Sequence, residues 1–69
     1  MLDAVVDPDV LRELRTQRAM SQDDLALRAG LGRQTVIRAE QGKPIRISSL
    51  RRLADALHVS PRRLLLRAR

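Results

Sequence analysis

The chain has 69 residues, a length that limits it to one small domain. It has no cysteine, which excludes both a disulfide framework and a thiolate metal site. It also has no aromatic residue, which disfavours modules that stack single-stranded bases on Phe or Tyr and favours a core of short packed helices. The net charge of +6 is uneven, because residues 1–24 hold three Arg against six Asp/Glu and residues 25–69 hold eleven Lys/Arg against two. We therefore expect an all-α domain with one surface that meets a polyanion.

After a short arm at residues 1–6, capping and turn residues divide the chain into five short predicted helices. Asp7 followed by Pro8 predicts an N-cap and a first helical residue, and an apolar stripe then continues the first helix to about residue 18. Ser21 opens a capping box for the second helix. Gly30 is expected to end that helix, because glycine adopts the left-handed conformation at little cost.

The three remaining helices are marked in the same way. The third is expected to begin at about residue 32 or 33 and to stop at Gly42. Ser48 or Ser49 is predicted to cap the fourth, whose apolar residues at 50, 53, 54 and 57 follow the helical period. Ser60 and Pro61 predict the start of a fifth helix that continues through the leucines at 64–66.

The connection between the second and third helices is only about three or four residues long, which predicts a helix-turn-helix at about residues 22–41. At helical spacing, one side of the third helix carries Thr35, Val36 and Ala39. The opposite side carries Arg33, Gln34, Ile37, Arg38 and Gln41. Arg and Gln can each form paired hydrogen bonds with a base edge, and Ile can contact a thymine methyl group. This second side is therefore predicted to read bases in duplex DNA.

Several motifs occur together at a joint spacing that is more specific than any one of them. They are Leu14-Arg15, Ser21-Gln22-x-x-Leu25-Ala26-x-x-Ala29-Gly30, Val36, Glu40-Gln41-Gly42-Lys43 and Leu53-Ala54-x-Ala56-Leu57-x-Val59-Ser60. Through them, residues 9–66 resemble the Cro- and lambda-repressor-like helix-turn-helix family. The resemblance implies a compact five-helix bundle that binds DNA, with residues 1–69 as a single domain.

The resemblance and the helix pattern together give expected roles to individual positions. Base contacts are expected from Arg33, Gln34, Ile37 and Arg38. Phosphate contacts are expected from Gln22, Thr35, Lys43 and Arg46. The resemblance also implies a largely buried ion pair between Arg15 and Glu40 that would orient the third helix. A homodimer interface is expected at His58, Pro61, Leu65 and Leu66.

Three residues depart from the family pattern. Gly32 stands where a Ser or Thr cap is frequent, Ala39 where a larger aliphatic residue is frequent, and Gln41 where Asn is common. We therefore expect a weakly capped third helix and free core volume at Ala39 that Leu11 or Leu50 would fill. These departures concern stability and leave the resemblance intact.

An enzyme is not expected. His58 is the sole histidine, and it has no Cys or Ser partner that suggests catalysis. Asp23 and Asp24 point about 100° apart, so they do not form a catalytic carboxylate pair. They lie on a first helical turn, where the helix dipole favours negative charge and explains their presence. No metal, cofactor or small-molecule ligand is therefore predicted.

The favoured interpretation is a cytoplasmic transcriptional regulator of bacterial or phage type, a repressor rather than an activator, that binds a palindromic operator as a homodimer. The alternative is an antitoxin or adaptor that binds a partner protein and regulates itself through DNA. Its partner would use the leucine-rich end, Leu27, and the arm residues Leu2, Val5 and Val6. A third possibility, a protein that binds RNA or a membrane surface, is disfavoured by the lack of stacking aromatics and of a strongly amphipathic basic helix.

Overall fold

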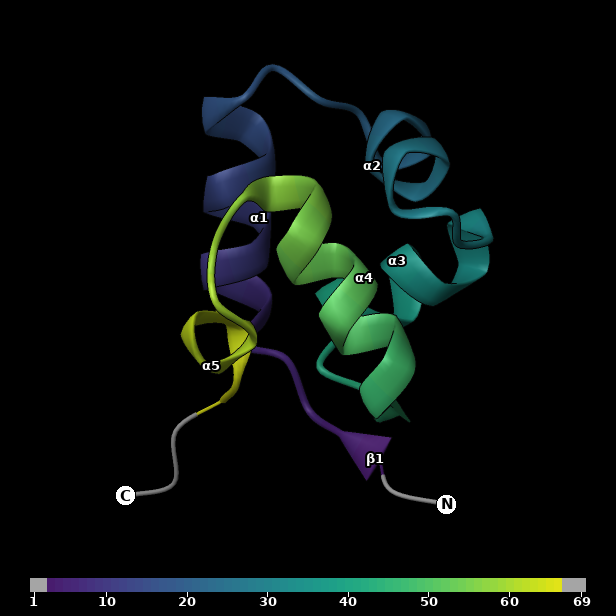
Figure 1. Cartoon of the computed structure of the whole chain (residues 1–69), viewed down its shortest axis with the longest axis vertical. Helices are drawn as coiled ribbons and strands as arrows, with labels where there is room; N and C mark the ends of the chain where they lie inside the picture. The colour runs from purple at the N-terminus through teal and green to yellow at the C-terminus, as the bar shows by residue number, and fades with distance from the viewer. Residues whose placement is uncertain (1–2, 67–69) are drawn as a thin grey trace.

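The computed structural model describes residues 3–66, which form five helices and a two-stranded sheet (Figure 1). The elements in chain order are β1 (Asp3–Ala4), α1 (Pro8–Gln17), α2 (Gln22–Ala29), α3 (Arg33–Glu40), β2 (Ile45–Arg46), α4 (Ile47–Leu57) and α5 (Pro61–Leu64). The predicted five-helix bundle with a helix-turn-helix is confirmed, with the small sheet as an addition. No helix in this part of the chain is long and apolar enough to cross a membrane.

The first two helices begin and end where the sequence predicts. The Asp7 side chain accepts hydrogen bonds from the backbone N–H groups at the start of α1. In the capping box of α2, Ser21 Oγ accepts from the Asp24 backbone N–H at 3.0 Å, and Asp24 Oδ2 accepts from the Ser21 N–H at 2.9 Å. Gly30 follows α2 with φ 68°, the left-handed conformation expected of a helix C-cap glycine.

Two later helix boundaries differ from the prediction. The prediction that Ser48 or Ser49 caps α4 is wrong, because α4 begins at Ile47 directly after Arg46, whose backbone is extended in β2. The prediction that the fifth helix continues through Leu65 and Leu66 is also wrong, since α5 ends at Leu64 and Leu65 is extended and pairs with Val6. The third helix follows expectation, because Gly32 precedes α3 without a side-chain capping bond.

The N-terminal arm is part of the fold rather than a free segment. Asp3 and Ala4 pair antiparallel with Arg46 and Ile45, and Val6 is fully buried. On its other side the arm is fixed by hydrogen bonds from Asp7 N to Leu64 O at 2.8 Å and from Leu66 N to Val5 O at 2.9 Å. Val6, considered above for a partner interface, is therefore a core residue, whereas Leu2 lies outside the described residues.

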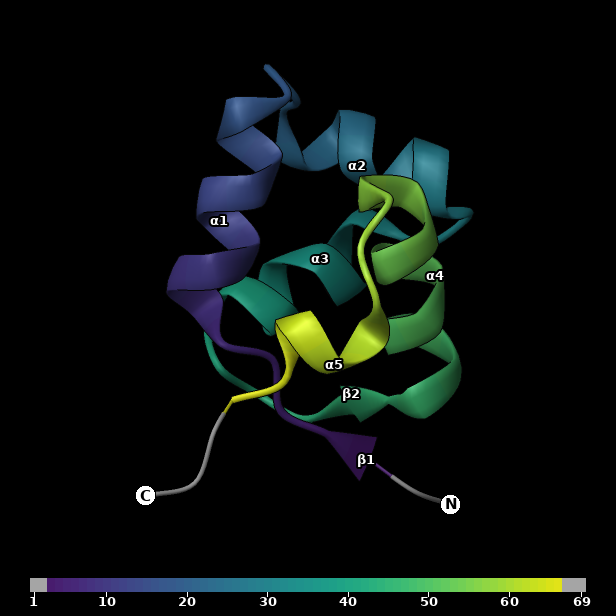
Figure 2. The ribbon, with the colours of Figure 1, turned by 60° about the vertical axis from the view of Figure 1, so that its left-hand side comes forward.

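Leucines from several elements form the core. The largest fully buried side chains are Leu11, Leu25, Leu53, Leu57, Leu64, Val6 and Val36. In Figure 2, α2 lies above α3 and β2 lies below it, and α3 packs against both. Ala39 is fully buried and belongs to the same core as Leu11 (0% exposed) and Leu50 (2% exposed).

Candidate nucleic-acid interface

The third helix has one buried side and one exposed side. Val36 and Ala39 are fully buried, since α3 packs against α2 and α1. The side chains of Arg33, Gln34 and Arg38 are exposed, whereas those of Thr35 and Ile37 are half-buried. The exposed side therefore presents two guanidinium groups and one carboxamide, which are the groups that form paired hydrogen bonds with guanine and adenine in the major groove.

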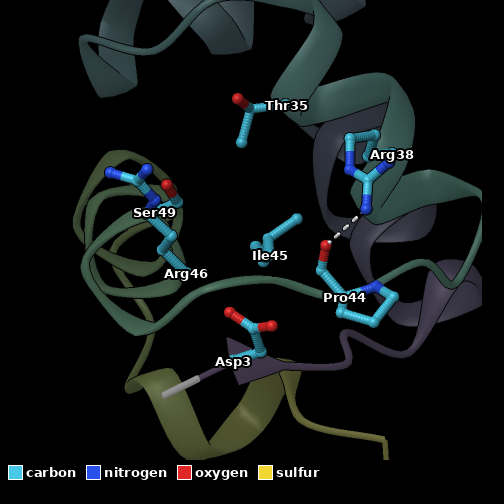
Figure 3. Close-up of a pocket in the computed structure, with 7 residues that line it drawn as sticks. All are labelled: Asp3, Thr35, Arg38, Pro44, Ile45, Arg46 and Ser49. Atoms are coloured by element: carbon cyan, nitrogen blue, oxygen red, sulfur yellow. Dashed lines mark hydrogen bonds between the residues drawn. The ribbon is translucent and has the colours of Figure 1, made fainter. Parts of the chain in front are cut away.

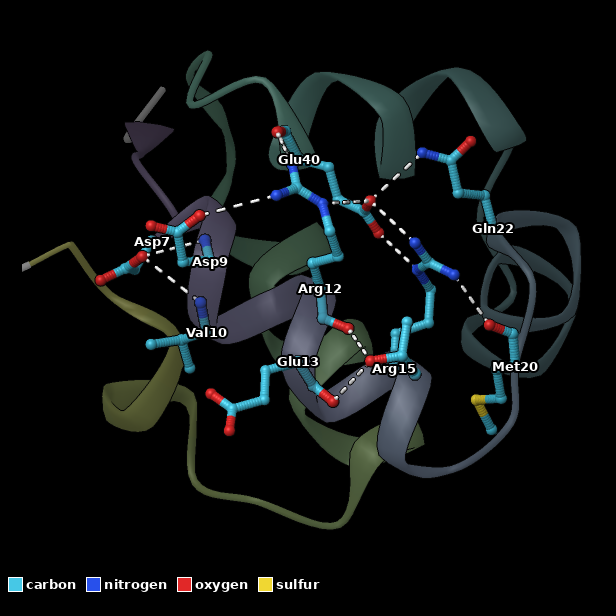
Figure 4. Close-up of polar contacts among 10 residues, drawn as sticks. Asp7, Asp9, Val10, Arg12, Glu13, Arg15, Met20, Gln22 and Glu40 are labelled. Carbon is cyan, nitrogen blue, oxygen red and sulfur yellow. Dashed lines mark hydrogen bonds and ion pairs between the residues drawn. The ribbon is translucent and has the colours of Figure 1, made fainter.

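An ion pair holds the C-terminal end of α3 against α1 (Figure 4). Arg15 Nε donates to Glu40 Oε2 at 2.6 Å and Arg15 Nη2 donates to Oε1 at 3.1 Å, in a paired geometry that fixes the orientation of both groups. Arg15 Nη1 also donates to the backbone oxygen of Met20 at 2.8 Å. Glu40 is the one charged side chain in the core of residues 3–66. This single contact therefore joins α1, the turn that precedes α2, and the end of α3.

Two further side chains donate to Glu40, and neither contact was expected from the sequence. Arg12 Nη2 lies 3.4 Å from the backbone oxygen of Glu40, and Arg12 Nε lies 3.8 Å from Oε1. Gln22, which is expected to contact a phosphate, donates its amide to Glu40 Oε1 at 3.3 Å. Arg12 precedes Arg15 by one helical turn, so helical spacing alone places the two cations on one side of α1. That spacing is the signal that could have identified Arg12.

The cations on the exposed side of α3 also have partners within the chain. Arg33 Nε lies 3.3 Å from Asp23 Oδ1, and both side chains are well exposed to solvent. Arg38 Nη2 donates to the backbone oxygen of Pro44 at 3.0 Å. Exposed contacts of this kind contribute about 1 kcal/mol or less, so a phosphate or a base edge can replace them.

Residues from four elements surround a pocket of about 480 Å³ beside α3 (Figure 3). Its lining residues are Asp3, Thr35, Arg38, Pro44, Ile45, Arg46 and Ser49. The structure thus brings together Thr35, Arg38 and Arg46, three of the residues expected to contact DNA. Asp3 and Ser49 were not identified from the sequence, because the pairing of β1 with β2 that brings Asp3 here has no local signal. Lys43 is exposed in the turn before β2 and does not line this pocket.

The residues expected at a homodimer interface lie on the surface at the end of α4 and around α5. His58 ends α4 in the left-handed conformation, and both His58 and Pro61 are exposed. Leu65 is 37% exposed and Leu66 is 53% exposed. Leu27 on α2 is the most exposed large apolar residue of the described chain, at 84%. Within residues 3–66, no three metal-ligating side chains lie close enough together to hold a metal ion.

Comparison with known proteins assigns this arrangement to a family. Residues 11–64 match a family model described as helix-turn-helix. The chain is similar to the restriction-modification controller protein C.AhdI from Aeromonas hydrophila, with 39% identity, a TM-score of 0.77, and coverage of 84% of this chain and 89% of that one. It is also similar to a hypothetical transcription factor from Neisseria, with 30% identity, a TM-score of 0.74, and coverage of 90% and 80% respectively.

One further similarity is confined to a small part of a larger protein. A variant of hydroxyethylphosphonate dioxygenase matches with 26% identity and a TM-score of 0.82, but the chain spans only 14% of its length. No curated protein sequence matches the chain. Two comparisons indicate a helix-turn-helix protein: the family match over residues 11–64 and the similarity to C.AhdI over most of both chains. The division of α3 into a buried and an exposed side indicates the same. The chain belongs to the Cro- and lambda-repressor-like helix-turn-helix family.

Proposed function

We propose that this protein is a transcriptional repressor that binds a palindromic DNA operator as a homodimer, with α3 in the major groove. The observation that carries the proposal is the exposed side of α3, where Arg33, Gln34 and Arg38 project from a helix whose opposite side is buried. A regulatory role is further supported by the similarity to a restriction-modification controller and to a hypothetical transcription factor.

The orientation of α3 favours base reading over a purely electrostatic contact. Paired hydrogen bonds to a base edge require donors in a fixed position, and each good pair contributes about 1–3 kcal/mol of discrimination. The contact between Arg15 and Glu40 supplies that rigidity at one end of the helix. Thr35, Lys43 and Arg46 would contact phosphates on either side, and Gln22 would do so by turning from Glu40 toward the backbone.

The homodimer would form through the exposed leucines that follow α5. Leu65 and Leu66, together with His58 and Pro61, would pair with the same residues of a second copy in a two-fold interface. To read a palindromic operator, the dimer would have to hold its two α3 helices about one turn of DNA apart, roughly 34 Å.

Binding by variants at two positions tests the proposal. Gln34→Ala removes a base contact, so it should lower affinity for the preferred sequence and leave affinity for unrelated duplexes nearly unchanged. Lys43→Ala removes a phosphate contact, so it should weaken binding to all duplexes alike. It should also reduce the slope of log affinity against log salt concentration by about the amount that one phosphate contact contributes. An equal loss on every sequence after Gln34→Ala would contradict base reading by α3.

A second candidate is an adaptor or antitoxin that binds a partner protein, and the exposure of Leu27 favours it. This side chain is 84% exposed, and a partner would bury it at a site apart from the exposed side of α3. Leu27→Glu should then abolish a co-purified heteromeric complex while DNA affinity stays unchanged. A complex that survives this substitution would remove the support that Leu27 gives to this candidate.

A further inference from the structure

The small sheet places an acidic side chain at the proposed DNA-binding surface. Ala4 and Ile45, which pair with each other in the sheet, are buried at 6% and 5% exposure. Successive residues of a strand point to opposite sides, so Asp3 and Arg46, the neighbouring pair, both project outward. Side chains of directly paired residues lie next to each other on one side of a sheet. The β1–β2 register therefore places Asp3 next to Arg46, whose guanidinium extends toward Ser49 and away from the Asp3 carboxylate (Figure 3).

The same carboxylate lines the pocket that contains the expected DNA contacts. Asp3 shares this pocket with Thr35, Arg38 and Arg46, and Figure 3 shows its carboxylate on the opposite side of Ile45 from Thr35. Within residues 3–66, Asp3 forms no ion pair with Arg38 or Arg46. Its negative charge is therefore not neutralised by a direct contact in this part of the chain, and it lines the same pocket as Thr35 and Arg46, the side chains proposed to contact phosphates.

We propose that Asp3 limits the affinity of this protein for the DNA backbone, because its carboxylate repels the phosphate that Arg46 and Thr35 attract. This inference rests on the proposed function. Phosphate contacts supply nearly all of the affinity for DNA of unrelated sequence, so a weaker phosphate contact lowers retention at such sites. Binding then depends more on the base contacts of α3. The charge acts on every sequence alike, which distinguishes Asp3 from a base-reading residue.

The experiment compares Asp3→Ala with Asp55→Ala, which also removes one exposed carboxylate. Asp55 lines a different pocket, with Arg28, Arg52 and His58. This pocket has no lining residue in common with the pocket that Asp3 lines. Affinity would be measured by fluorescence anisotropy on a random-sequence duplex of about 20 base pairs and on a duplex enriched by the protein itself. Far-UV circular dichroism would check that the helical fold is unchanged in both variants.

Asp3→Ala should tighten binding to both duplexes by a similar factor, about fivefold at low salt, and the gain should shrink as salt screens the charge. For Asp3→Ala, the slope of log affinity against log salt concentration should become steeper by up to the amount that one phosphate contact contributes. Asp55→Ala should change binding by less than about twofold. Equal effects of the two variants would overturn the inference, and so would weaker binding to the enriched duplex alone, which would make Asp3 a base contact. If the wild-type protein enriches no sequence, the proposed function fails, whereas the comparison on the random duplex still tests Asp3.

Discussion

Replacing Arg15 by Met is expected to destabilise the fold strongly, because it leaves the Glu40 carboxylate buried without its closest cation. The Glu40 side chain is 5% exposed and that of Arg15 is 13% exposed, so water screens the pair poorly. Breaking one side of a buried ion pair costs about 3–5 kcal/mol. Because Arg12 and Gln22 still face Glu40, we expect about 3 kcal/mol. That is a large part of the roughly 3–10 kcal/mol available to a domain of this length.

Urea unfolding followed by far-UV circular dichroism measures this loss, since the chain has no Trp or Tyr to report by fluorescence. Arg51→Met, at an exposed position of α4, is the matched control and should change the free energy of unfolding by less than about 0.5 kcal/mol. The double variant Arg15→Met/Glu40→Leu should recover much of the loss, because no buried charge remains. A loss below about 1 kcal/mol for Arg15→Met, or a double variant as unstable as the single one, would refute the reasoning.

Three further substitutions test the turns around α2, each by thermal unfolding. Ser21→Ala removes half of the capping box and should cost about 1 kcal/mol at neutral pH. The backbone and side-chain hydrogen bonds of Ser21 lower the pKa of Asp24 below its ordinary 3.8, so their stabilisation is present above that pH and is lost as the pH falls through the lowered pKa. Alanine keeps the backbone N–H of residue 21, which is the larger cause of the lowered pKa of Asp24, so the deficit of Ser21→Ala should shrink only slightly in acid. A deficit that disappears in acid would contradict the persistence of this backbone hydrogen bond. Gly30→Ala should cost about 1–2 kcal/mol, because φ is +68° and the added Cβ would lie 3.0 Å from Arg52 Nη1. Ala19→Gly should instead stabilise the fold by about 0.5–1 kcal/mol, since it relieves a φ of 53° at some cost in chain entropy. A lower melting temperature for this variant would show that the strain at this turn is not the dominant effect.

The parts of the fold that the sequence predicts well are those decided by neighbouring residues. The side chains of Asp7 and Ser21 accept hydrogen bonds from backbone N–H groups at the start of a helix, and Gly30 ends one. Each acts within a few positions, so its effect is visible in the local sequence pattern. The start of α4 is different, because pairing between β1 and β2 extends the backbone of Arg46 and lets the helix follow directly. A serine at position 48 or 49 is a reasonable cap in isolation, but long-range pairing decides this boundary.

The candidate interface shows the same division. Helical period separates the buried side of α3, with Val36 and Ala39, from the exposed side, with Arg33 and Arg38. Contacts between distant segments are not visible in that period. The position of Asp3 beside the expected DNA contacts depends on a strand pairing that spans much of the chain, and two-residue strands carry almost no pattern of their own.

The exposed side of α3 is proposed to read a specific DNA sequence as part of a two-fold dimer. Selection of bound duplexes from a random pool at near-physiological salt, followed by sequencing, tests specificity, symmetry and spacing in one experiment. We predict a palindromic motif whose half-sites are about one helical turn apart. A pool without any enriched motif, although the protein binds DNA in a manner that salt abolishes, would contradict base reading and leave only binding to the phosphate backbone.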